Sequence, residues 1–257
     1  MTKLSASHLH VERGGRTILH DLSFEAESGA LIVVIGPNGA GKSTLMSTLV
    51  GLESPTSGQV TLDGAPLHQI DSKALARRRA YLPQNPRCEW PLPVERLVAL
   101  GLTPTLPPFG PLSDEMHARV QAALQAYDIV HLADQAATTL SGGELSRAML
   151  ARAVVGDPEM LIVDEPTTGL DPRHALDAMA RLKNLTAQGR LVIASVHDLT
   201  LAARFADRII ALADGRIVAN GPALEVLTAD LLRRIFSVDA AVLQTPGGPL
   251  VDISTAA

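Results

Sequence analysis

The sequence has few of the features that direct a chain to a membrane, a disulfide framework or a nucleic acid. Its single cysteine, Cys88, cannot form an internal disulfide, which fits a reducing cytoplasm. Apolar residues make up 46% of the 257 residues, yet no uninterrupted apolar run approaches the length of a membrane span, and the N-terminus lacks a signal-peptide core. The net charge of −5 provides no basic field for nucleic acid. We therefore expect a cytoplasmic α/β protein that binds no nucleic acid and reaches a membrane only through a partner.

The chain is organised around a glycine-rich segment, Gly36-Pro37-Asn38-Gly39-Ala40-Gly41-Lys42-Ser43-Thr44. It follows the apolar run 31–35 and leads into residues 45–50, which is the order strand, glycine loop, helix. Three glycines let backbone N–H groups converge on a polyphosphate, and the helix N-terminus adds a positive dipole. Lys42 is placed to reach the β- and γ-phosphates, and the Ser43 hydroxyl to bind Mg²⁺. The segment predicts a site for a nucleoside triphosphate; the alternative is a glycine turn that merely starts a helix.

Two carboxylates follow the fully apolar run Met160-Leu161-Ile162-Val163. A strand that is buried on both faces tolerates charges only at its end, where they meet water, metal or substrate. Asp164 suits the Mg²⁺ shell, as a Walker B aspartate does. Glu165 points to the other side of the strand and is placed to orient or deprotonate the water that attacks the γ-phosphate. A strand that simply ends in a polar turn is the weaker alternative, because the same chain carries the glycine loop.

A second glycine-containing segment is Leu140-Ser141-Gly142-Gly143-Glu144. Ser141 with Glu144 three residues later predicts a capping box that opens a helix. Two glycines in the first turn cost helix stability, so a cap alone explains them poorly. They expose backbone N–H groups beside a positive helix end, which predicts a second phosphate site. Two phosphate sites on separate segments suggest two chains that share nucleotide.

The remaining sequence predicts a single domain, 1–257, with an α/β core that a helical segment interrupts. Residues 4–35 predict antiparallel strands with a tight turn at Gly14-Gly15. Prolines are too frequent after Gln84 for a sheet interior, and helical patterns follow, so residues 86–155 predict a helical insertion. The α/β core then comprises 1–85 and 156–257, the first part including the antiparallel strands.

Local signals place several helix ends. Asp71 predicts the N-cap of a short helix, whose basic run 77–79 we expect to form a solvated face. Asp171-Pro172 predicts the start of a long helix, and Gly189 predicts its end. Two short helices are expected over about 222–236, and a small strand pair from 239 onward.

Taken together, the motifs resemble those of an ABC-transporter ATPase, over nearly the whole chain and in that family's order and spacing. The five-residue segment 140–144 is highly specific to the family. The residues that carry the resemblance are Gly36–Thr44, Gln84, Leu140–Glu144, Leu161–Glu165, Gly169–Asp171 and His197.

The resemblance implies a head-to-tail homodimer around two ATP molecules with Mg²⁺. The glycine loop Gly36–Thr44, which corresponds to the P-loop, is then expected to hold ATP in one subunit. The residues of the other subunit that are expected to close on this ATP are Ser141, Gly142 and Gly143. The resemblance also implies that Gln84 senses Mg²⁺ and the membrane partner, that Asp171 crosses the dimer, and that His197 touches the γ-phosphate as a switch histidine. Taken alone, Gln84 and His197 would be ordinary polar residues.

One position departs from the family pattern. Family members usually carry an aromatic residue in the first hairpin to stack on adenine, where this chain has Arg13. An arginine guanidinium can stack on a base, and exposed cation–π contacts contribute about 0.5–1 kcal/mol. The departure therefore affects how tightly and how selectively ATP binds, and not whether it binds.

A softer resemblance, to the ATPases of iron-chelate, haem and cobalamin importers, lies in residues 84–94, the proline-rich loop and the short tail. It implies an ATP-hydrolysing motor on the cytoplasmic face of the cell membrane, docked on permease subunits that a substrate-binding protein supplies. Trp90 is predicted either to contact the permease or to pack inside the helical segment. The alternatives are another ABC transporter, including an exporter, a non-transport module that dimerises with ATP, and, more distantly, a P-loop kinase or GTPase.

Overall fold

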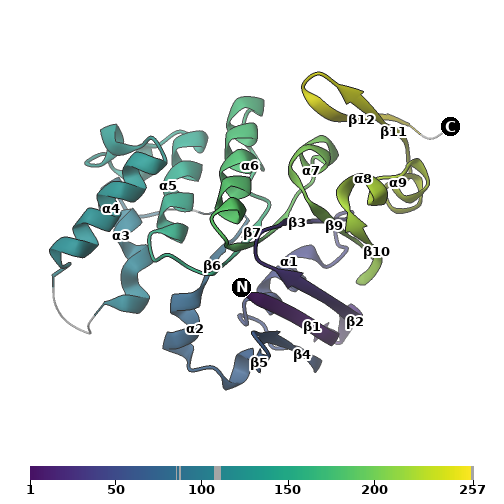
Figure 1. The fold of residues 1–257 in the computed structure, drawn as a ribbon, viewed down its shortest axis with the longest axis horizontal. Helices are drawn as coiled ribbons and strands as arrows, with labels where there is room; N and C mark the ends of the chain where they lie inside the picture. The colour runs from purple at the N-terminus through teal and green to yellow at the C-terminus, as the bar shows by residue number, and fades with distance from the viewer. Residues whose placement is uncertain (85, 87, 107–110, 256–257) are drawn as a thin grey trace.

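The computed structural model describes residues 1–84, 86, 88–106 and 111–255. Within this part of the chain, a parallel sheet crosses the middle of the molecule and an antiparallel sheet lies below it in Figure 1. A group of helices lies on the left of that view, and a hairpin near the C-terminus lies at the upper right.

The central sheet has a parallel core with one antiparallel edge strand. In spatial order its strands are β10 (Arg216–Pro222), β9 (Arg208–Ala213), β3 (Leu31–Ile35), β8 (Leu191–Ser195), β7 (Met160–Asp164) and β6 (Arg79–Leu82). Only β10 runs antiparallel to its neighbour, β9, and the other pairs are parallel. The expectation of antiparallel strands throughout 4–35 is therefore wrong for β3, which pairs in parallel on both sides because it belongs to this sheet.

The second sheet is antiparallel, and its turns are those that the glycine signals predict. Arg13 pairs with Arg16 across Gly14-Gly15, which confirms the first turn. Its strands, in spatial order, are β2 (Arg16–Glu27), β1 (Lys3–Arg13), β4 (Ser57–Leu62) and β5 (Ala65–Pro66). A separate hairpin near the C-terminus consists of β11 (Val238–Thr245) and β12 (Gly248–Thr255).

Helices occupy the positions that the capping signals indicate. Asp71, Ser113, Ser141 and Asp171 each accept a backbone N–H as N-cap residues. The α-helices are α1 (Lys42–Leu49), α2 (Ser72–Arg78), α3 (Val94–Ala99), α4 (Asp114–Ala126), α5 (Gly142–Val154), α6 (Pro172–Ala187), α7 (Leu199–Phe205), α8 (Ala223–Val226) and α9 (Ala229–Phe236). Short 3₁₀ segments cover Leu67–Gln69, Leu100–Thr105, Val130–Leu132 and Ala137–Thr139.

Two buried clusters hold these layers together, one on each face of the central sheet. In β3, Val33 faces one cluster and Val34 the other, so the strand is apolar throughout because both of its faces are covered. The first cluster joins the sheet to α5, α6, α7 and the helices of residues 94–126. The second joins it to α1 and the antiparallel sheet. The P-loop helix α1 is thereby wedged between the two sheets.

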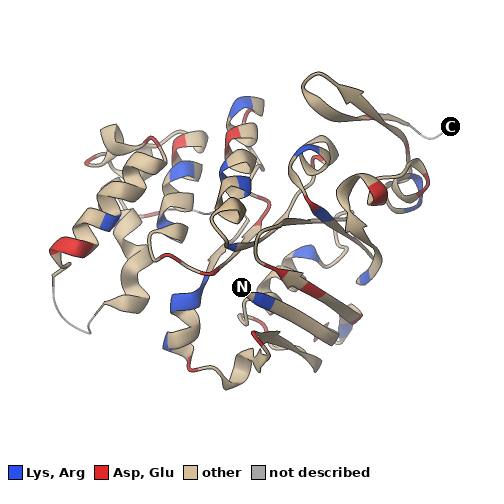
Figure 2. Ribbon diagram, in the orientation of Figure 1, with Lys and Arg blue, Asp and Glu red and all other residues tan. Residues whose placement is uncertain are grey.

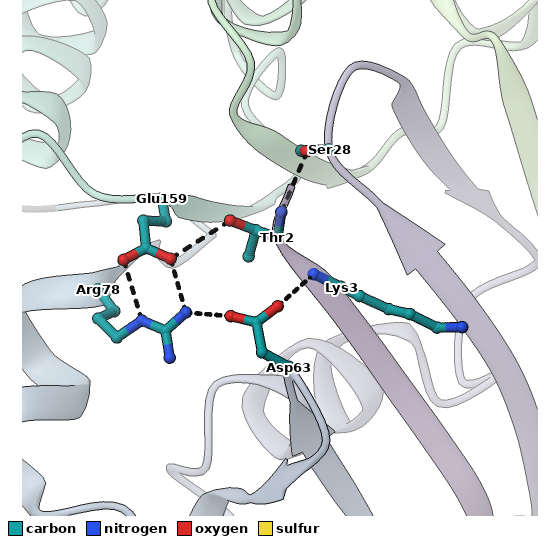
Figure 3. Close-up of polar contacts among 6 residues, drawn as sticks. All are labelled: Thr2, Lys3, Ser28, Asp63, Arg78 and Glu159. Carbon is teal, nitrogen blue, oxygen red and sulfur yellow. Dashed lines mark hydrogen bonds and ion pairs between the residues drawn. The ribbon is translucent and has the colours of Figure 1, made fainter.

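The basic run 77–79 is only partly a solvated face, which corrects the expectation: Arg77 is exposed, whereas Arg78 and Arg79 are half-buried. Arg78 donates to both oxygens of Glu159, at 3.0 and 2.6 Å, and also contacts Asp63 (Figure 3). Arg79 is half-buried in β6, and its Nη1 has no hydrogen-bond partner among the described residues. The partners of Arg78 lie far along the chain, so helical spacing could not indicate them.

The Arg78 contacts fasten two neighbouring strands that lead to the candidate site. Arg78 precedes β6 and Glu159 precedes β7, whose first residues pair in the parallel register Arg79↔Met160. Burial would raise the pKa of Asp63, but hydrogen bonds from the Lys3 backbone N–H and the Arg78 guanidinium hold it below its ordinary value. The cluster therefore ties the antiparallel sheet to the starting ends of β6 and β7.

Charged residues are mixed rather than segregated. Figure 2 shows Lys and Arg alternating with Asp along α6, whereas on α5 the acidic position lies at the N-terminal end and is followed by basic ones. Across the described residues, none of the helices combines the length and apolar character needed to cross a bilayer.

Candidate active site

The P-loop adopts a backbone that only glycine accommodates at its turn into α1. Gly41 is the N-cap of α1, at φ +96°, in the left-handed region that other residues rarely adopt. A Cβ at Gly41 would lie 2.8 Å from Leu19 Cδ2, and one at Gly36 would lie 2.3 Å from the Leu212 carbonyl oxygen. Strands β2 and β9 therefore press directly on the loop. Among the loop's side chains, Asn38 and Ser43 are exposed, while Thr44 is buried.

Lys42 lies under the loop and bonds to it. Its side chain is buried, with Nζ donating to the carbonyl oxygens of Gly36 at 2.8 Å and Pro37 at 3.2 Å. Burial lowers the pKa of Lys42, while the nearby carboxylates of Glu165 and Asp164 oppose that change. The lysine thus lies within electrostatic reach of both predicted carboxylates.

Asp164 ends β7 as a buried carboxylate, 2% exposed. The hydroxyl of Ser195, at the end of the adjacent β8, donates to Asp164 Oδ1 at 2.5 Å. The same Ser195 oxygen accepts the backbone N–H of Glu165 at 2.8 Å. Ser195 therefore orients both acidic residues at once. The register Asp164↔Ser195 places it there, because parallel strands end at one edge of the sheet.

Three side chains from separate segments converge on Glu165. Gln84 donates to Glu165 Oε2 through Nε2, and Thr168 donates to the same oxygen at 3.1 Å. His197 Nε2 contacts Oε1. Glu165 is 7% exposed and has a left-handed backbone, φ +51°. The structure thus brings Gln84 and His197 together with Glu165, the three residues assigned to catalysis.

The second glycine segment forms a closed cap on the surface. The Ser141 hydroxyl and backbone N–H both donate to Glu144 Oε2, at 2.7 and 2.8 Å, which confirms the capping box. The Ser141 hydrogen bonds lower the pKa of Glu144. Ser141 and Gly142 are exposed, whereas Gly143 is buried. Gly142 lies near the loop that precedes α6, because a Cβ on Gly142 would be 3.9 Å from the Gly169 carbonyl oxygen.

Asp171 lies beside the Ser141–Glu144 cap. Arg13 lies apart from this cap and from the residues around Glu165. Asp171 caps α6, and hydrogen bonds from the His174 backbone and ring hold its pKa below the ordinary value. Arg13 is exposed at the tip of the first hairpin, where its guanidinium makes two hydrogen bonds to Glu53, at 3.2 and 2.6 Å. Lys42, Asp164 and Glu165 are thus buried together, whereas Ser141, Gly142 and Asp171 are exposed, and Gly142 and Glu165 line one pocket of about 180 Å³.

The sequence interpretation missed Ser195 and Thr168 as members of the site. The available signal for Ser195 was a polar residue at the end of an apolar run that is parallel to the Asp164 strand. Thr168 had no comparable signal, because its role depends on the turn that follows Glu165. Among the described residues, no group of three or more His, Cys, Asp and Glu side chains could hold a metal by itself.

Comparison with known proteins agrees with this geometry. The family model described as "ABC transporter" matches residues 19–168. The hemin import ATP-binding protein HmuV of Bordetella pertussis is 40% identical over 255 residues, 96% of each chain. The iron(3+)-hydroxamate import ATP-binding protein FhuC of Bacillus subtilis is 37% identical over 96% of this chain and 92% of its own. A solved metal-chelate-type ABC transporter in an inward-facing conformation superposes with a TM-score of 0.86 at 22% identity, covering 100% and 98% of the two chains.

The fold and site define a P-loop ATPase that consists of a parallel sheet, an antiparallel sheet and a helical layer. The chain belongs to the ABC transporter family, and within it this chain is an ATP-binding ATPase subunit.

Proposed function

We propose that this chain is the ATP-hydrolysing motor of a bacterial importer for a metal chelate, such as a ferric siderophore, haem or cobalamin. The observation that carries the hydrolytic part is the convergence of Gln84, Thr168 and His197 on Glu165, within electrostatic reach of Lys42. The cargo class follows from the relatives, since those named above import hemin and an iron hydroxamate.

In this proposal the P-loop, Gly36–Thr44, holds the triphosphate through its backbone N–H groups. Lys42 leaves the Gly36 and Pro37 carbonyls and bonds to the β- and γ-phosphates, which offer stronger, charged acceptors. Glu165 then orients or deprotonates the attacking water once Gln84 or His197 releases its carboxylate. His197, 42% exposed, stands between Glu165 and solvent and is the switch side chain.

Magnesium fits the donors at this site. Mg²⁺ prefers oxygen ligands and retains several waters, so it needs only one or two protein oxygens plus phosphates. Ser43 supplies a hydroxyl, Asp164 a buried carboxylate that Ser195 orients, and Gln84 an amide oxygen. When bound, the ion would neutralise charge on the β- and γ-phosphates.

Two partners complete the motor: a second copy of this chain and a permease. Ser141, Gly142, Gly143 and Asp171 of one copy are proposed to close on the ATP of the other, as the family implies; Ser141, Gly142 and Asp171 are exposed and therefore accessible to a second copy. Trp90 is 73% exposed, so it does not pack inside the helical segment as the alternative had it.

The permease is proposed to dock beside Trp90. A second candidate contact is a groove of about 570 Å³ between α2, β6 and the end of α5. Arg77, Arg79 and Arg152 line it together with apolar groups, and Trp90 is not part of its lining. Docking there would hold the chain at the cytoplasmic face of the cell membrane, with a substrate-binding protein on the opposite side. Arg13 is proposed to stack on adenine, with Glu53 holding its guanidinium plane.

Uptake in a strain that lacks the gene tests the cargo. We expect loss of one among ferric siderophore, haem and cobalamin uptake, restored by the wild-type chain but not by Glu165→Gln. Normal uptake of all three, with redundant importers deleted, would contradict chelate import and leave the ATPase assignment intact.

Experiments with purified protein distinguish an ATP-hydrolysing motor from a module that uses ATP only to dimerise. We expect Glu165→Gln to abolish turnover and to prolong the ATP-bound dimer, because ATP is then bound but not cleaved. Thr168→Ala is the companion variant, since it removes one donor to Glu165 while keeping the carboxylate. Unchanged hydrolysis in Glu165→Gln would remove Glu165 from its assigned role.

A further inference from the structure

The imidazole ring of His174 occupies the place that a side chain on Gly143 would take. A Cβ on Gly143 would lie 2.5 Å from His174 Cδ2 and 2.7 Å from Nε2. Gly143 is buried in the first turn of α5. Its φ is negative, so its backbone conformation does not require glycine. Gly142 differs, since a Cβ there would meet nothing closer than 3.9 Å.

The same imidazole is tied to Asp171. His174 is the third residue of α6, and its backbone N–H donates to Asp171 Oδ1 at 2.9 Å. Its ring Nδ1 lies 2.8 Å from Asp171 Oδ2. An ionised carboxylate only accepts hydrogen bonds, so Nδ1 carries the proton and the ring orientation is set. His174 therefore contacts both Gly143, in the segment 140–144, and Asp171.

Of the charged groups near His174, Arg181, Asp128 and Asp177 are engaged with one another, whereas Arg147 Nε is buried with no hydrogen-bond partner among the described residues. The hollow beside His174 is lined by Arg147, Arg173, Asp177, Arg181 and Asp128. Arg181 pairs with Asp128 at 2.7 Å and with Asp177 at 2.8 Å. Among these neighbours, the hydrogen-bond partner that the structure gives the His174 ring is Asp171.

We propose that His174 is a positioning residue that holds the signature turn, Ser141–Glu144, in register with Asp171. The inference rests on the proposed function, in which both elements close together on the ATP of a second copy. With the ring in place, α5 and α6 present their N-terminal ends as one rigid surface. Without it, each end has to be ordered separately when the dimer closes, which slows turnover but leaves the P-loop untouched.

Steady-state kinetics with three variants separate the two contacts. His174→Asn keeps a donor near the Nδ1 position, His174→Phe keeps a ring over Gly143, and His174→Ala removes both. We expect His174→Ala to lower kcat about tenfold with KM for ATP within about twofold, and the other two to fall between it and wild type. Binding of a fluorescent ATP analogue to the monomer should not change. His117→Ala is the matched control: that ring also bonds to its own helix start, at Ser113 O, and is exposed on α4.

Thermal unfolding tests the Gly143 contact without using activity. Gly143→Ala should lower Tm by about 2–4 °C. Adding His174→Ala should restore part of that loss, because the new methyl group then has room. Strictly additive losses would refute the contact, and a folded His174→Ala with wild-type kcat would refute the positioning role. If wild-type protein neither hydrolyses ATP nor dimerises with it, the proposed function fails instead, and the unfolding test still decides the contact.

Discussion

The two glycine segments, the P-loop and the signature turn, are both helix N-termini suited to phosphate, but their surroundings differ. The P-loop is compressed by its own chain: β2 and β9 leave no room for a Cβ at Gly41 or Gly36, and Lys42 is buried beneath it. The signature turn is exposed to solvent at Ser141 and Gly142. Its Ser141 hydroxyl and backbone N–H donate to the Glu144 carboxylate of the same turn.

In the proposed dimer, this difference separates a site that one chain completes from half of a site that a second copy completes. The P-loop has its lysine and nearby carboxylates in place before nucleotide arrives. The signature turn has backbone and hydroxyl donors held by its capping box, and Arg147 lies within electrostatic reach of Glu144. We therefore expect substitutions in the P-loop to abolish nucleotide binding by the single chain, and those in the signature turn to act only when two chains meet.

The largest expected effect is at Lys42. Lys42→Ala removes the only lysine beneath the loop in the described residues, so we expect nucleotide affinity and hydrolysis to fall by on the order of 100-fold or more. Equilibrium binding of ATP to the monomer measures it. Lys73→Ala, an exposed lysine on α2, is the control. Near-normal binding in Lys42→Ala would remove the contrast between the two segments.

The two segments should also differ in their tolerance of alanine. Gly41→Ala places a β-carbon 2.8 Å from Leu19 in a left-handed backbone, so we expect a loss of about 1–3 kcal/mol in unfolding free energy. Gly142→Ala meets no close neighbour and should change stability by less than about 0.5 kcal/mol, while impairing ATP-dependent dimerisation. Urea denaturation of both variants tests the pair, and equal losses would contradict it.

Acid should open the signature cap and leave the P-loop, which has no side-chain cap, unaffected. The folded-state pKa of Glu144 is lowered from 4.5, so its contribution is present above that pH and is lost as pH falls through the folded value. We expect Glu144→Gln to cost less than about 1 kcal/mol near pH 7 and nothing at low pH. Unfolding free energies at pH 7 to 3 measure the difference; a gap that widens in acid would have the wrong sign.

The smallest expected effect is at Arg13, which belongs to neither segment. Arg13→Ala should weaken ATP binding by less than about tenfold, since an exposed cation–π contact is worth about 0.5–1 kcal/mol. Arg16→Ala, its cross-strand neighbour, is the control and should have no effect. Competition between ATP and GTP for the single chain measures both, and identical values for the two variants would exclude stacking.

Interactions that span few residues could be read from the sequence. The capping box at Ser141, the N-caps at Asp71 and Asp171, and the turn at Gly14-Gly15 all involve partners three or four positions away. The basic run at Arg78 was misjudged for the opposite reason. Its partner Glu159 is 81 residues distant, and helical spacing carries no information about such a neighbour.

Some residues acquire their meaning only from packing. The need for glycine at position 143 becomes visible once the ring of His174 is seen against it. The exposure of Trp90 excluded one of two equal alternatives. Ser195 joined the site because two parallel strands end at the same edge.

The sequence by itself determined the family, the P-loop, the paired carboxylates and the signature turn, because each is a run of adjacent residues whose chemistry depends on local geometry. Only the tertiary structure decided which side chains surround Glu165, since Gln84 and His197 approach it from other segments at the edge where parallel strands end. It also decided that His174 joins the signature turn to Asp171. The physical reason is the same in both cases: packing of buried elements, and not chain proximity, sets the distances between these groups.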